Sequence, residues 1–121
     1  MLAPQPGLRW NKDIYIINSD GTGLRRLTEH PADDDYPSWS PDGRRIAFSS
    51  TRAGKSHIFV LELDSGRVKR LTVRGINSSS AWSPDGRWIA FRSLRGGVWG
   101  IYIMSEKGEG HSLRRIITSS Q

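Results

Sequence analysis

The chain has 121 residues, enough for one domain with a buried core, and a net charge of +6 from 18 Lys and Arg against 12 Asp and Glu. It has no cysteine, which excludes disulfides and thiolate metal sites, and no apolar run approaches the ~18 residues of a membrane-spanning helix. The N-terminal stretch lacks the charged and apolar regions of a secretory signal.

Residues 1–12 are rich in proline and then polar, and we interpret them as a tail or the remnant of an earlier strand. From Asp13 onward the chain repeats itself. Three β-rich apolar runs, Ile14–Ile17, Ile58–Leu61 and Ile101–Met104, are each followed by a turn and a short strand that ends in Thr. Because these runs are apolar at successive positions, we expect strands that are covered on both faces.

A hexapeptide, Trp-Ser-Pro-Asp-Gly-Arg, occurs twice, 43 residues apart, and is followed each time by an apolar strand. Pro suits the first inner position of a type I turn, Asp the second, and Gly the positive φ that rejoins a strand. The hexapeptide therefore predicts a hairpin turn, and we expect its tryptophan to pack between neighbouring modules. The residues assigned this structural role are Trp39, Pro41, Asp42, Gly43, Trp82, Pro84, Asp85 and Gly86.

Four short strands in about 43 residues, with no helical periodicity, indicate the blades of a β-propeller. The sequence predicts an all-β fold, an incomplete β-propeller of about two and a half four-stranded antiparallel blades. We expect a half blade at 13–28, full blades at 36–72 and 79–118, and a tail at 119–121.

The pattern Trp-Ser-Pro-Asp-Gly-Arg-x-Ile-Ala-Phe, then Arg-x-Gly, Ile-Tyr and Leu-Thr, resembles the TolB-like propeller repeat over residues 13–118. Such blades occur in TolB, in the propeller domains of prolyl-oligopeptidase-type peptidases and in tricorn-like proteins. The resemblance implies a periplasmic location if the chain is TolB-like and part of a longer protein.

Fewer than three blades cannot close a ring, since propellers close with four to eight. We expect the chain to be part of a longer protein; the alternative is a homo-oligomer in which two copies complete one ring.

In a propeller, the link from the outer strand of one blade to the next blade, and the turn between the second and third strands, lie at the same end. We predict a protein-binding face there. Trp88 and Trp99 are candidate surface aromatics. The predicted partner-binding residues are Asp33, Asp34, Asp35, Arg52, Lys55, Arg74, Arg95 and Trp99.

The acidic run at 33–35 is interpreted as a solvated loop, because it lacks the alternating oxygen ligands and closing acid of a calcium loop. His30, His57 and His111 have no metal-ligand spacing, and we expect each to be exposed or in a hairpin. No sequence pattern of a catalytic serine or a phosphate-binding loop is complete. We therefore expect no metal, no cofactor and no catalytic residue.

The favoured function is a non-enzymatic scaffold that binds protein partners, as the resemblance to TolB implies. The first alternative is the gating propeller of a prolyl-oligopeptidase-type peptidase, separated from its catalytic domain. Association with an anionic ligand or with nucleic acid is a weaker alternative, because the basic residues are spread along the chain and recur on predicted outer strands, where charge protects a sheet edge.

Overall fold

The computed structural model describes residues 12–118, and this range contains ten β-strands and no helix. All strand pairs are antiparallel. The strands are β1 (Tyr15–Ile16), β2 (Arg25–Arg26), β3 (Asp34–Trp39), β4 (Arg45–Ala53), β5 (Lys55–Glu62), β6 (Val68–Arg70), β7 (Ile76–Trp82), β8 (Trp88–Arg95), β9 (Val98–Ser105) and β10 (Gly108–Thr118).

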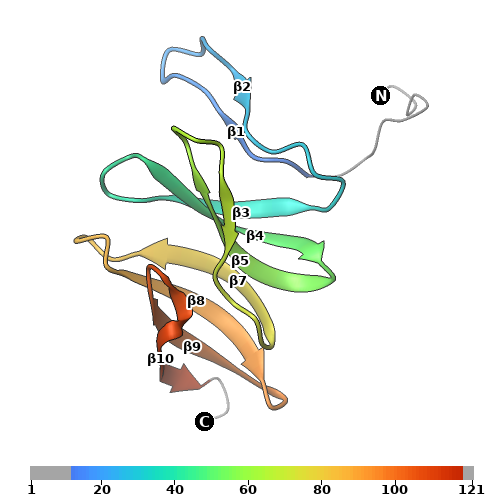
Figure 1. Cartoon of the computed structure of the whole chain (residues 1–121), viewed down its shortest axis with the longest axis vertical. Coiled ribbons are helices and arrows are strands. Elements are labelled where there is room, and N and C mark those ends of the chain that lie inside the picture. Colours follow the sequence, from blue (N-terminus) through green and yellow to red (C-terminus); the bar gives the residue numbers. More distant parts are fainter. Residues whose placement is uncertain (1–11, 119–121) are drawn as a thin grey trace.

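The strands form three sheets that follow one another along the molecule (Figure 1). β1 and β2 make a two-stranded sheet, β3–β4–β5–β6 make the second sheet, and β7–β8–β9–β10 make the third. Each strand pairs with its neighbour in sequence, which is the meander of a propeller blade. The predicted all-β, incomplete propeller is confirmed, although the two full blades begin at Asp34 and Ile76, slightly earlier than the sequence suggested.

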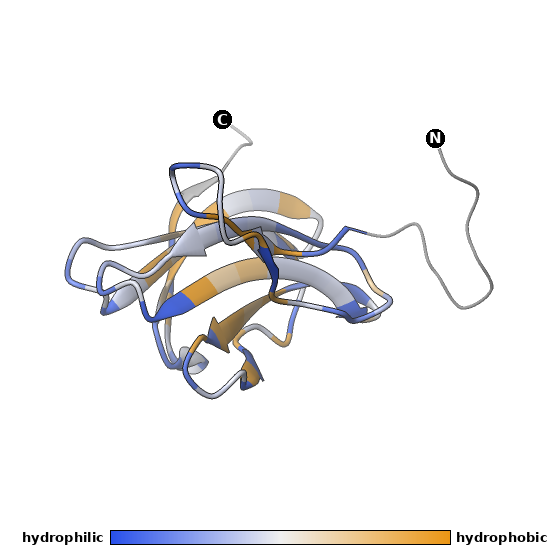
Figure 2. Ribbon diagram, turned by 90° about the horizontal axis from the view of Figure 1, so that it is seen from above, coloured by the Kyte–Doolittle hydropathy of each residue, from blue (hydrophilic) through white to orange (hydrophobic). Residues whose placement is uncertain are grey.

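The central blade is buried on both faces, as its apolar strands predicted. Along β5, Ile58 and Val60 join the core shared with the third sheet, and Phe59 and Leu61 join the core shared with the first. Strand alternation explains this division, since successive side chains point to opposite faces. Figure 2 shows the hydrophobic segments within the strands and hydrophilic residues at the connecting loops.

The half blade is different, because its outer face has no neighbouring sheet among residues 12–118. Ile14 is buried against the central blade, whereas Tyr15 and Ile17 are more than half exposed. The third run, Ile101–Met104, is intermediate: Met104 is fully buried and the other three are half-buried. The burial of these similar runs is therefore set by the presence or absence of a neighbouring blade.

The repeated Pro-Asp-Gly turns have the same geometry in both copies. Ser40 Oγ donates to Asp42 Oδ1 at 2.6 Å and accepts the Arg45 amide at 3.0 Å, and Ser83 makes the matching bonds with Asp85 and Trp88. The serine hydroxyl and the amide two residues beyond the aspartate hold the pKa of Asp42 below its usual value, and likewise that of Asp85. The aspartates thus act within their turns, as predicted.

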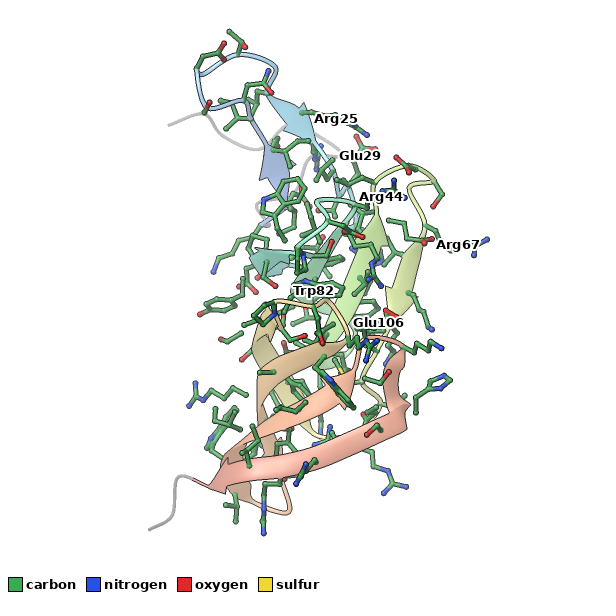
Figure 3. All side chains as sticks on the ribbon, turned by 90° about the vertical axis from the view of Figure 1, so that its left-hand side faces the viewer. Arg25, Glu29, Arg44, Arg67, Trp82 and Glu106 are labelled. Carbon is green, nitrogen blue, oxygen red and sulfur yellow. The ribbon has the colours of Figure 1, made fainter. Side chains whose placement is uncertain are left out.

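The two repeat tryptophans have different surroundings. Trp82 lies between the second and third sheets (Figure 3), where its Nε1 donates to the Ser38 carbonyl at 3.0 Å and the Arg45 guanidinium lies 4.7 Å from its ring centroid. Packing between blades is confirmed for Trp82. For Trp39 it stays a prediction: the residue is 53% exposed, and the preceding blade has only the strands β1 and β2 within residues 12–118.

Candidate partner-binding face

The predicted binding face is the end of the sheets at which the β4–β5 and β8–β9 turns meet the links between blades. We call it the loop face and define it by residues 29–33, 53–55, 73–75 and 96–97. The amide of Thr51 donates to the Asp33 carbonyl, and one hollow brings Lys55, Arg74 and Gly96 together. The opposite end, the turn face, comprises residues 41–44, 63–67 and 84–87.

The junction between the half blade and the central blade, which we call the first crevice, contains the acidic run at its loop-face end. Asp33 accepts the backbone amide of Lys12 at 2.9 Å, and the Lys12 ammonium lies 3.6 Å from Asp35. Asp34 is buried in β3, with both carboxylate oxygens 3.1 Å from the Arg52 guanidinium. The solvated-loop interpretation is therefore wrong for Asp34, whose charge is neutralised inside the protein.

Arg52 and its repeat partner Arg95 extend along their blades over aromatic rings. The guanidinium of Arg52 lies 5.3 Å from the ring centroids of Phe48 and Phe59, while that of Arg95 lies 5.8 Å from Phe91 and 5.0 Å from Tyr102. Such contacts add a cation–π attraction to the packing. In each blade a serine two residues earlier, Ser50 or Ser93, accepts a hydrogen bond from the arginine Nε.

The carboxylate that pairs with Arg95 is Glu109, from the start of β10. Its Oε2 lies 2.9 Å from Arg95 Nη1, and its Oε1 accepts the backbone amides of Val73 and Arg74. Burial alone would raise the pKa of Glu109, but these hydrogen bonds together hold it below the usual value. The pair ties the third blade to the link that precedes it.

His57 lies in the β4–β5 hairpin, one of the two settings expected for it, and is buried between the second and third blades and not exposed. Its Nε2 lies 3.0 Å from Arg70 Nη2 and its Nδ1 lies 2.9 Å from Thr72 Oγ1. Because arginine only donates, Nε2 is the acceptor and the neutral ring carries its proton on Nδ1. Burial, followed by the charge of Arg70, lowers the pKa of His57. Asn77 Nδ2 also lies close to this ring, at 3.1 Å from Nδ1.

Among the basic residues predicted for the site, Lys55 and Arg74 are exposed and make no ion pair within residues 12–118. With Arg95 they line an open hollow of about 470 Å³ in the second crevice, between the central and third blades. Gly75 at its wall has φ +77°, and a Cβ there would stand 2.5 Å from the Leu94 carbonyl oxygen. Only glycine fits this close approach.

The aromatic candidates lie apart from this hollow. Trp99 is half-buried in β9, and the Arg92 guanidinium lies 4.1 Å from its ring centroid. Trp88 begins β8 and is 41% exposed. The structure thus brings together Lys55, Arg74 and Arg95 and leaves Trp99 outside their hollow.

Sequence reasoning missed the inward-facing partners of these arginines: Ser50, Ser93, Asn77 and Glu109. The two serines recur at the repeat spacing beside Arg52 and Arg95, so the repeat carried a signal for them. The sequence held no such signal for Glu109, because this residue reaches Arg95 from an irregular segment of β10 that has no counterpart in the central blade.

No group of three His, Cys, Asp or Glu side chains in residues 12–118 is arranged to hold a metal ion. Within the same range, no helix has the length and apolarity to cross a membrane.

Consecutive four-stranded antiparallel meanders, stacked through shared cores, define this chain as part of a β-propeller. Its particular type follows from comparison with known proteins: residues 6–80 match the family model described as the TolB β-propeller domain. The chain belongs to the TolB β-propeller family.

Similar sequences are TolB proteins of bacteria. The chain is 41% identical over 59 residues to the Protein TolB homolog of Chlorobium luteolum, covering 49% of this chain and 14% of that protein. It is 39% identical over 80 residues to the Tol-Pal system protein TolB of Francisella tularensis, covering 61% of this chain and 18% of the relative. The chain therefore spans less than a fifth of the length of each of these two relatives.

Solved structures give the same result. The putative TolB from Agrobacterium tumefaciens superposes with a TM-score of 0.76 at 26% identity, covering 88% of this chain and 42% of that one. TolB from Acinetobacter baumannii superposes with a TM-score of 0.74 at 25% identity, covering 84% of this chain and 25% of that one. An oligogalacturonate lyase, at 19% identity and a TM-score of 0.67, shares the fold alone.

Proposed function

We propose that this chain is a non-enzymatic propeller segment that holds a protein partner on its loop face. The observation that carries the proposal is the hollow lined by Lys55, Arg74 and Arg95, which joins residues from two blades at the loop ends of their strands. Loops displayed by a rigid sheet are the usual place for binding residues. The names of the relatives, which place them in a Tol-Pal system, support protein partners for this chain as well.

The buried titratable groups support a binding role over a catalytic one. Asp34 is bound to Arg52, Glu109 to Arg95 and backbone amides, and His57 to Arg70 and Thr72. Each of these groups is engaged in joining strands or blades, whereas a catalytic acid or base must be within reach of a substrate. The TolB names of the relatives also favour a scaffold over the propeller of a peptidase.

Site-specific photo-cross-linking tests the proposal. A photoreactive amino acid placed at Lys55 or Arg74 in the native protein, in its host cell, should give a defined cross-linked protein. The matched control is Ser65, an exposed residue on the turn face, which should give none. Adducts at position 65 with none at 55 and 74, or no adduct at any position, would refute the proposed function.

A further inference from the structure

The two crevices of the loop face are built on equivalent positions, which allows their charges to be compared. Asp34 faces Ser50 across the β3–β4 pair, just as Asn77 faces Ser93 across β7–β8. At the repeat spacing, the positions of Asp33, Asp34 and Asp35 are therefore taken by Ile76, Asn77 and Ser78. The three carboxylates of the first crevice have no counterpart on the strand that opens the second.

In the first crevice the acids and bases of the chain neutralise one another. Asp34 pairs with Arg52, Asp35 lies within ion-pair distance of Lys12, and Asp33 accepts the Lys12 amide. Acids at the start of the central blade thus neutralise the basic residues of this junction.

The second crevice also contains basic residues, but the strand that opens it, β7, carries no acidic residue. Lys55, Arg74 and Arg95 line its hollow, and Glu109 is the carboxylate that reaches this region from β10. Glu109 is already bound to Arg95 and to two backbone amides. Lys55 and Arg74 thus line one hollow as like charges, an arrangement that a bound anion stabilises.

We propose that the second crevice binds an acidic segment of the protein partner, with Asp or Glu carboxylates between Lys55 and Arg74. This inference rests on the proposed function and specifies the chemistry of the partner. The hollow is open and its wall includes Ile76 and Leu94, so it suits the side chains of an extended peptide laid across it.

The test uses a fluorescein-labelled decapeptide of alternating Glu and Gly, whose binding to the protein is followed by fluorescence anisotropy at several salt concentrations. We expect saturable binding that weakens as salt rises. The double variant Lys55→Gln/Arg74→Gln should bind roughly 2- to 30-fold more weakly at low salt, since each exposed charge pair is worth about 0.2–1 kcal/mol. Ile76→Asp, which restores an acid of the first crevice, should also weaken binding.

The matched control is Arg67→Gln/Lys69→Gln, which removes the same charge near the turn face and should change the affinity less than about twofold. Equal losses in the two double variants would show a response to net charge and overturn the proposal. Unchanged affinity in Lys55→Gln/Arg74→Gln would overturn it as well, provided that the urea midpoint shows the variant to be folded. Inorganic phosphate that displaces the peptide better than chloride at equal ionic strength would overturn the carboxylate assignment.

The two proposals fail in different ways. Cross-linked protein at positions 55 and 74, together with full peptide affinity in the double variant, would overturn the acidic-segment proposal and leave the proposed function standing. Hollow-specific peptide binding without any cross-linked protein would support the charge preference and refute the proposed function.

Discussion

Replacing Trp82 by Phe tests how the blades are held together. The change removes the hydrogen bond from Nε1 to the Ser38 carbonyl, worth about 1 kcal/mol, and weakens the contact with Arg45, worth about 0.5–1 kcal/mol. The smaller ring also leaves space beside the core that Trp82 contacts. Together these losses should lower the free energy of unfolding by about 2 kcal/mol.

Trp39→Phe is the matched control, because it makes the same chemical change at the equivalent position of the preceding hexapeptide. The Trp39 side chain is 53% exposed, so its replacement should change the free energy of unfolding by less than about 0.5 kcal/mol. Urea unfolding of both variants, followed by far-ultraviolet circular dichroism, provides the comparison. Equal losses, or a larger loss for Trp39→Phe, would refute the interblade role of Trp82.

Three further predictions concern buried and titrating groups. Arg95→Gln leaves the Glu109 carboxylate without its charged partner and should cost about 2–3 kcal/mol in urea unfolding; a loss no larger than that of a surface substitution would contradict the pairing. Because the pKa of His57 is lowered from 6.5, the unfolded state takes up its proton first, so stability should be full above about pH 6.5 and fall as the pH drops toward the lowered folded value. His57→Asn should flatten the stability–pH curve below about pH 6.5, and an unchanged slope there would argue against His57 as the source of the pH dependence. The Asp42 carboxyl should titrate below pH 3.8 by NMR, so its contribution to stability is present above that pH and lost as the pH falls through the folded pKa. Ser40→Ala should raise the titration midpoint of Asp42, and an unmoved midpoint would exclude the Ser40 hydroxyl as the cause of the lowered pKa.

The repeat, the turns and the blade architecture could be predicted from sequence because they depend on local chemistry. Proline, aspartate and glycine determine the backbone of the hexapeptide turn, and the apolar alternation of Ile58–Leu61 determines a strand covered on both faces. The two turns accordingly have matching hydrogen bonds.

The environment of single residues could not be predicted in the same way, because it depends on what the neighbouring blade supplies. Trp39 and Trp82 occupy equivalent positions, yet only Trp82 has an inner strand to receive its indole N–H. His57 is buried because the third blade covers it, and Asp34 because Arg52 folds back along the rings of its blade. Sequence identified Arg52 and Arg95 as repeated residues, but not that their charges are held inside.

Chemical-shift mapping provides the most direct test of a binding loop face. The labelled protein is titrated with the unlabelled Glu-Gly decapeptide, and the backbone resonances of both ends of the sheets are followed. We expect saturable shifts at Lys55, Arg74, Gly96 and Gly97, with the resonances of residues 41–44 and 63–67 unmoved. Shifts centred on the turn face, or none that saturate, would contradict it.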